Sequence, residues 1–151
     1  MSANHINIKN KRAKFEFQLE DEFVAGIQLT GSEIKSIRNS KASITEAFCV
    51  FVEDELFIRN MHVAEYDNAS YYNHKPRRDR KLLLKRQELD KLFKKVQTKG
   101  FSIVPTHLFI NDNGLAKVRI YLASGKKLHD KRQDLKQKDA RREMDRAIKA
   151  N

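Results

Sequence analysis

Residues 101–123 read FSIVPTHLFINDNGLAKVRIYLA, and this stretch decides the class of fold. Two runs rich in apolar residues flank the tetrapeptide NDNG at 111–114, which favours a tight turn. In the second run, polar or amphipathic residues alternate with apolar ones, as in a strand with one buried face. The alternating apolar residues are Val118, Ile120 and Leu122. The stretch predicts an antiparallel hairpin, in which Pro105 marks an edge or a bulge.

Other segments predict strands of the same kind, and these are residues 15–19, 23–29, 47–52 and 55–63. The acidic pair Glu53 and Asp54 separates the last two segments and predicts a second hairpin. Gly26 marks a bulge or a close backbone approach. About six strands joined mostly by short turns must cover or close their edges. We therefore predict a mainly β fold with flanking helices, an OB-like antiparallel β-barrel that continues into a basic C-terminal tail.

Two segments predict helices. Residues 86–99 carry apolar side chains at helical spacing, and Gly100 follows as a stop signal. The shorter segment, residues 31–41, has Ser32 as a candidate N-cap and Glu33 in its first turn, where a carboxylate suits the helix dipole. Its two isoleucines, Ile34 and Ile37, are three residues apart and are expected to face the core.

The chain divides into three parts. Residues 1–13 are polar and are expected to form a flexible basic lead-in. Residues 14–125 are expected to form the OB-like RNA-binding barrel. Residues 126–151 contain ten basic and five acidic residues, a net charge of +5, with few apolar side chains that could hold a helix against a core. We expect this tail to be disordered in the free protein and to become helical on a polyanion, although a merely solvated tail would have the same composition.

Length and charge narrow the class of protein. The 151 residues suggest a single domain, and the net charge of +11 favours a polyanionic partner because binding releases counterions. Cys49 is the only cysteine, so no disulfide can form within the chain. Neither a signal peptide nor an apolar run of membrane-spanning length is present, which makes the cytoplasm the expected location.

The sequence gives little support to catalysis. The five histidines do not recur at helical spacing, and HExxH, paired CxxC, Walker A and GxGxxG motifs are absent. Cys49 lies between apolar residues and reads as a core thiol rather than a nucleophile. We therefore expect no enzyme activity, no metal and no cofactor.

A basic cluster indicates a candidate interface. Residues 77–86, RRDRKLLLKR, contain six cations and one anion, and Tyr71, Tyr72 and His74 lie just before them. Cations that meet phosphates beside planar groups that stack on bases suit RNA. A solvated basic surface would look the same, so the cluster alone leaves both interpretations open.

Five motifs, taken in order, resemble the small protein B (SmpB) family of tmRNA-binding, or SsrA-binding, proteins. They are NKRAKFEF at 10–17, GSEIKSIR at 31–38, RKLLL at 80–84, KGFSIVP at 99–105 and GKKLHDKR at 125–132. The resemblance covers the chain from about Asn10 to its C-terminus. It implies a non-catalytic protein that binds the tRNA-like domain of tmRNA and brings it to stalled ribosomes.

The resemblance also implies roles for residues. Lys35 would contact a phosphate, whereas Glu33 could accept hydrogen bonds from base or ribose groups or could brace neighbouring cations. The basic residues expected to join them at the tmRNA surface are Lys11, Arg12, Arg80 and Lys81. In the tail, His129 would stack on a ribosomal RNA base. The residues expected at the decoding site and in the empty mRNA channel are His129, Asp130, Lys131, Arg132, Lys136, Lys138, Arg141 and Arg142.

The implied partners are the tRNA-like domain of tmRNA, the RNA of the small ribosomal subunit and, indirectly, an elongation factor Tu complex. We expect a monomer without a membrane partner. Two other functions fit the composition: an RNA-processing enzyme on an OB-like scaffold, or a basic structural protein associated with the ribosome.

Overall fold

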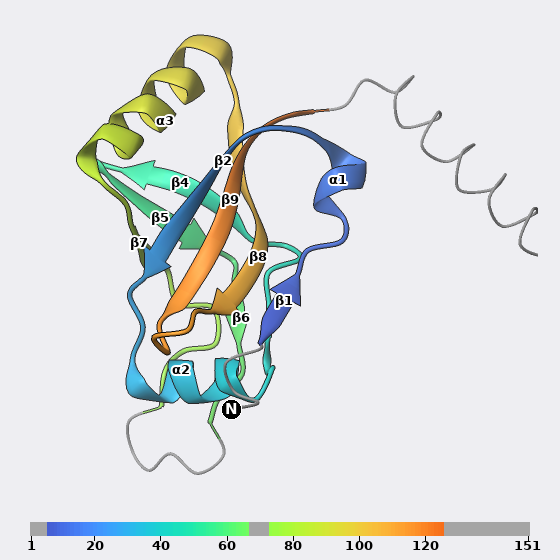
Figure 1. The fold of residues 1–151 in the computed structure, drawn as a ribbon, viewed down its shortest axis with the longest axis vertical. Coiled ribbons are helices and arrows are strands. Elements are labelled where there is room, and N and C mark those ends of the chain that lie inside the picture. Colours follow the sequence, from blue (N-terminus) through green and yellow to red (C-terminus); the bar gives the residue numbers. More distant parts are fainter. Residues whose placement is uncertain (1–5, 67–72, 126–151) are drawn as a thin grey trace, which may run out of the picture.

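The structure is a computed structural model that describes residues 6–66 and 73–125. Strands predominate, and three helices flank them (Figure 1). In chain order the elements are β1 (Asn7–Lys9), α1 (Ala13–Glu16), β2 (Phe17–Ile27), α2 (Gly31–Arg38), β3 (Ala42–Ser43), β4 (Phe48–Val52), β5 (Glu55–Arg59), β6 (His62–Val63), β7 (Arg80–Leu83), α3 (Arg86–Lys99), β8 (Ser102–Ile110) and β9 (Ala116–Gly125).

The main sheet closes on itself. Its strand order is β1-β8-β4-β5-β7-β2-β9, and β9 pairs again with β8. Strands β8, β4, β5, β7, β2 and β9 therefore form a ring, and β1 lies outside the ring on β8. All of the registered pairings in this sheet are antiparallel. This closed antiparallel ring confirms the prediction of an OB-like, mainly β fold. As expected, closing the ring removes most of the exposed strand edges.

The hydrophobic core fills the ring and continues under two helices. Strand residues supply most of it, and Ile37 of α2 and Leu92 of α3 belong to the same buried cluster. Helix α3 lies over one end of the ring and α2 over the other (Figure 1). The two helices therefore seal the core at both ends.

The hairpins and the longer helix follow the sequence prediction. Strands β4 and β5 flank Glu53 and Asp54, and β8 and β9 flank the turn at 111–114. Helix α3 spans the predicted residues 86–99 and ends at Gly100, which has a left-handed φ of 68°. The register of β8 against β9 shifts between Pro105 and His107, which confirms the predicted bulge. The close approach at Gly26 is confirmed, because a Cβ at this position would lie 3.3 Å from the Leu83 Cβ.

The first third of the chain differs from its prediction. Residues 7–9, expected to be part of a flexible lead-in, form β1 by pairing with β8. Residues 13–16 form the single turn α1, so the predicted strand at 15–19 is wrong at its start. The rest of that segment and residues 23–27 of the next one join into the long strand β2, which ends two residues before the predicted limit and has an irregularity between Leu19 and Glu22. Pairing with distant strands, rather than the local pattern, sets these boundaries.

Further differences from the prediction are a strand that divides in two, a helix with another N-cap and a strand that was not predicted. The predicted strand at 55–63 divides into β5 and β6 at Asn60, whose φ of 62° is incompatible with an extended strand. The N-cap of α2 is Thr30 rather than Ser32, and the helix ends at Arg38. Strand β7 was not predicted, because its sequence RKLL lies within the basic cluster and shows only a short alternation.

Among the helices in the residues that the structure describes, none combines the length and the hydrophobicity needed to cross a lipid bilayer.

Candidate nucleic-acid interface

A buried carboxylate, Glu33 in the first turn of α2, organises the charged side chains of this region. Glu33 and Thr30 form a capping box, in which the Thr30 amide donates to Glu33 Oε1 over 2.8 Å. Arg78 Nη2 donates to the same oxygen over 2.7 Å, and Arg80 Nε donates to Oε2. The Glu33 and Arg80 side chains are both fully buried. One carboxylate thus satisfies a helix terminus and two guanidinium groups.

The Arg80 guanidinium shapes the backbone that leads into β7. Its Nη1 donates to the carbonyls of Met61 and Arg78, both over 2.9 Å. Its Nη2 donates to the Pro76 carbonyl over 3.2 Å. These acceptors belong to the two chain segments on either side of residues 67–72. Arg80 therefore holds in place the backbone from which Lys75, Arg77 and Arg78 project.

The surroundings of Glu33 and Arg80 favour the charged forms of both side chains. Burial alone would raise the pKa of Glu33, but the hydrogen bonds from Arg78 and the Thr30 amide and the charge and hydrogen bond of Arg80 outweigh it and lower the pKa to about 2. Burial lowers the pKa of Arg80, and the charge of Glu33 opposes that effect. Because an arginine does not lose its proton in proteins, the pair stays ionised at neutral pH.

Beside this cluster, polar contacts join the two chain segments that flank residues 67–72. The Asn73 side chain pairs with the Tyr66 backbone in both directions, accepting from its amide over 3.2 Å and donating to its carbonyl over 3.0 Å. His74 is buried, and its Nε2 donates to the Val63 carbonyl over 2.9 Å. The other ring nitrogen of His74 then accepts from the Ser32 hydroxyl over 2.8 Å. These contacts join Asn73 to Tyr66 and attach His74 to β6 and α2.

The predicted basic residues Lys35 and Lys81 lie on the surface near this cluster. Lys35 is exposed on α2, with its Nζ 5.4 Å from the centre of the Tyr66 ring. Lys81 is partly exposed on β7 and forms a long ion pair with Glu55, at 3.7 Å. Lys35 therefore keeps its charge available to a phosphate, whereas the charge of Lys81 is shared with a carboxylate.

The prediction that Arg80 contacts RNA is wrong for this conformation, because its side chain is fully buried. Of the two roles considered for Glu33, burial excludes direct contact with base or ribose groups and leaves the bracing of neighbouring cations. Arg78, which the sequence analysis did not single out, is a partly exposed member of the cluster. Alternation within RKLLL was the signal that could have indicated the burial of Arg80. Alternate side chains of a strand share a face, and Arg80 and Leu82 share the inward face of β7.

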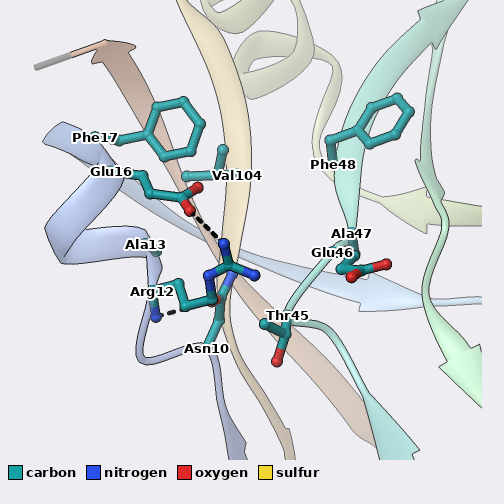
Figure 2. A pocket seen from close by; sticks show the side chains of 10 residues that line it. All are labelled: Asn10, Arg12, Ala13, Glu16, Phe17, Thr45, Glu46, Ala47, Phe48 and Val104. Carbon is teal, nitrogen blue, oxygen red and sulfur yellow. Dashed lines mark hydrogen bonds and ion pairs between the residues drawn. The ribbon is translucent and has the colours of Figure 1, made fainter.

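Lys11 and Arg12, the other predicted contacts, lie away from α2, beside helix α1. Both are exposed, and Arg12 forms an ion pair with Glu16 at 3.0 Å. Figure 2 shows this pair at the edge of a hollow of about 320 Å³, across from Thr45 and Glu46. Because Glu16 and Glu46 supply negative charge and Arg12 is already paired, this hollow is a poor site for a phosphate. The predicted tmRNA residues thus fall into two separate groups.

The predicted ribosome-contacting residues, from His129 to Arg142, lie outside the described residues. Within the described part of the chain, no three His, Cys, Asp or Glu side chains are placed to share a metal ion. Cys49 is buried, and burial raises the pKa of its thiol, so the thiol is not activated as a nucleophile.

The closed ring of strands, with cationic side chains on its surface beside the buried ion pair of Glu33 and Arg80, defines a basic OB-like β protein. The model of the SmpB protein family matches residues 7–150. The chain belongs to the SmpB protein family.

Relatives of known name match over nearly their whole length. The SsrA-binding protein of Phocaeicola vulgatus is 56% identical over 149 residues, 99% of each chain. The SsrA-binding protein of Christiangramia forsetii is 55% identical over 146 residues, 97% of this chain and 93% of the relative. A chain from the solved structure "tmRNA-SmpB: a journey to the center of the bacterial ribosome" is 41% identical, with a TM-score of 0.68 over 82% of this chain and 86% of that one.

Proposed function

We propose that this protein is an SsrA-binding protein, which binds tmRNA through the tRNA-like domain of that RNA and acts without catalysing a reaction. The observation that carries the proposal is the 56% identity, over 99% of both chains, to a protein named for SsrA binding. The net charge of +11 supports it, since a polyanion is the partner that such a charge favours.

The geometry around α2 suggests how one part of the RNA is held. Lys35 presents a cation on the surface, Arg78 is partly exposed and shares its charge with Glu33, and the buried pair of Glu33 and Arg80 fixes the backbone beneath Arg78. Because these cations are positioned before the RNA arrives, less side-chain and backbone entropy is lost on binding. In this proposal Lys35 contacts a phosphate directly, Lys81 contributes after leaving Glu55, and Glu33 and Arg80 act by positioning.

The proposal extends to the ribosome. The protein would bring tmRNA, together with an elongation factor Tu complex, to ribosomes that have stalled without a codon in the decoding site. The tail would then enter the decoding site and the empty mRNA channel, where mRNA would otherwise lie. Its net charge of +5 and scarce apolar residues suit a segment that orders against RNA. Translating ribosomes are in the cytoplasm, so we place the protein there.

Recovery of the RNA bound in cells tests the proposed function. The full-length tagged protein is purified from cells at moderate salt, and the co-purifying RNA is sequenced. We expect tmRNA to be enriched over tRNA and ribosomal RNA. Enrichment of ribosomal RNA that persists in high salt would instead indicate a permanent ribosomal component and contradict the proposal. In a parallel incubation with divalent metal, cleavage of the bound RNA would contradict the non-catalytic role.

A further inference from the structure

Two hollows on the surface of the ring adjoin one another and form a continuous groove. The smaller is the hollow of about 320 Å³ beside α1, and the larger, of about 550 Å³, lies between β4, β8 and α3. Phe17, Phe48 and Val104 line both of them. Figure 2 shows the rings of Phe17 and Phe48 on opposite sides of the smaller hollow. The groove therefore runs from α1 to α3.

The larger hollow presents large apolar side chains that no described segment of the chain covers. Phe48 of β4 is 44% exposed and Phe93 of α3 is 38% exposed. The Phe93 ring contacts Phe51 edge-on, with the ring centres 5.2 Å apart, and this contact fixes its position. One registered pair, Cys49 with Ile103, joins β4 to β8 beneath these rings. Several exposed aromatic rings around one hollow indicate a surface that binds an apolar group.

The described residues end beside this groove. Gly125, the last residue of β9, is registered opposite Phe17, the first residue of β2. Residues opposite one another in an antiparallel pair have Cα atoms about 4.5–5.5 Å apart. Three further residues span up to about 10 Å when extended, so Leu128 lies within reach of the groove. Because the tail is attached here, its effective concentration at the groove is on the order of millimolar, which favours it over a second copy of the chain.

The first residues of the tail complement the groove in charge and in hydrophobicity. Residues 126–127 are lysines, and Leu128 follows them. Glu16 and Glu46 line the smaller hollow, and Glu16 is paired with Arg12 at 3.0 Å. Glu46, which forms no ion pair with another described residue, is therefore the carboxylate that suits a lysine of the tail. The aromatic rings of the larger hollow suit Leu128, because moving a leucine side chain out of water is favourable.

We propose that residues 126–135 of the tail dock in this groove while the protein is away from the ribosome. Leu128 then packs against Phe48 and its neighbouring rings, and one of the two preceding lysines lies beside Glu46. The disorder expected for the free tail then applies to residues 136–151.

Docking of this segment has a consequence for RNA binding. It covers His129, Lys131 and Arg132, which are expected at the decoding site, and so withholds them from other RNAs. That consequence rests on the proposed function, in which the tail leaves the groove to enter the decoding site. The docking contact itself does not depend on the proposed function.

Limited digestion of the full-length protein with trypsin, in the absence of RNA, tests the docking. Mass spectrometry of the fragments gives separate rates for cleavage after Arg132, inside the docked segment, and after Arg146, outside it. Cleavage of a transiently released segment follows the population of the released form. We expect Leu128→Ser and Phe48→Ser each to speed cleavage after Arg132 by about three- to tenfold and to leave cleavage after Arg146 unchanged. The double variant should be cleaved no faster than the faster single variant, because both residues act through one contact.

Each variant has a matched control. Leu115→Ser is the control for Phe48→Ser, since Leu115 is 57% exposed and lines neither hollow. Met144→Ser is the control for Leu128→Ser, since it removes an apolar residue of the tail outside the docked segment. Leu128 lies outside the ring of strands, so its variant tests the contact even if Phe48→Ser destabilises the ring.

Three results would overturn the docking. They are a rate after Arg132 that Leu128→Ser leaves unchanged, equal acceleration after Arg132 and Arg146, and protection that rises with protein concentration, which would assign the groove to a second copy. A parallel measurement of affinity for the tmRNA transcript, an RNA copy of the tRNA-like domain of tmRNA made in vitro, keeps the two proposals apart. Absent binding with faster cleavage in the variants contradicts the proposed function alone, whereas tight binding with unchanged cleavage overturns the docking alone.

Discussion

Arg80 on β7 and Glu33 on α2 form an ion pair in which both side chains are fully buried. The pair joins an element of the ring to the helix that seals one end of it, and its remaining hydrogen bonds involve backbone carbonyls, the Thr30 amide and Arg78. A buried pair of this kind adds little stability compared with a well-packed apolar pair, but removing one partner is costly. The contribution of the pair is therefore better tested by replacing one of the two residues than by replacing both.

We predict that Arg80→Met lowers the free energy of unfolding by about 3–5 kcal/mol, because Glu33 stays buried with one guanidinium fewer and five hydrogen bonds are lost. The double variant Glu33→Gln/Arg80→Met should recover part of this loss. Denaturant unfolding provides the measurement. Arg86→Met is the control, since Arg86 forms an exposed pair with Asp90 that is expected to contribute below about 1 kcal/mol. A loss as small as that of the control would refute a structural role for the buried pair.

Acid should weaken the same cluster in a defined pH range. The pKa of Glu33 falls from an ordinary 4.5 to about 2 in the folded protein. Because the folded pKa is the lower one, the stabilisation is complete above pH 4.5 and is lost as the pH falls from there towards 2. The difference in unfolding free energy between wild type and Glu33→Gln should narrow over that range by about 3 kcal/mol. A difference between the two proteins that stays constant over that range would contradict the assignment.

The parts of the fold that the sequence predicted are those encoded locally. Helix α3 follows from its apolar spacing and Gly100, and the two hairpins follow from their turn residues. Strands β1 and β7 are short, and each exists because distant strands supply its hydrogen bonds. A single sequence does not reveal those partners.

The candidate site likewise divides into features that the local sequence indicates and features that depend on distant contacts. Motif resemblance indicated Lys35, Lys81 and Glu33, but net charge could not distinguish an exposed arginine from a buried one. Arg80 lies 47 residues from Glu33 in the chain, and only the packing of β7 against its neighbours brings the two together.

We predict that Lys35→Ala lowers the log–log salt slope of binding to the tmRNA transcript by about one unit, because Lys35 offers an exposed charge to a phosphate. Lys81→Ala should lower the salt slope by less, because Lys81 must leave its ion pair with Glu55 on binding, which offsets part of the gain from a phosphate contact. Filter binding from low to moderate salt measures both slopes, with Lys91→Ala as the control. Slopes that match the control would exclude Lys35 and Lys81 from phosphate contact.

Truncation after Lys126 separates the two RNA-binding tasks of the proposed function. The shortened protein keeps all of the described residues, so its affinity for the tmRNA transcript at physiological salt should remain nearly intact. Peptide tagging on stalled ribosomes, measured in a reconstituted translation reaction, should be abolished, because the segment proposed to occupy the decoding site is missing. A full-length variant with residues 127–151 in shuffled order keeps the net charge and controls for non-specific attraction. Tagging restored by the shuffled tail would mean that charge alone suffices, whereas a large loss of affinity on truncation would show that the tail also holds tmRNA.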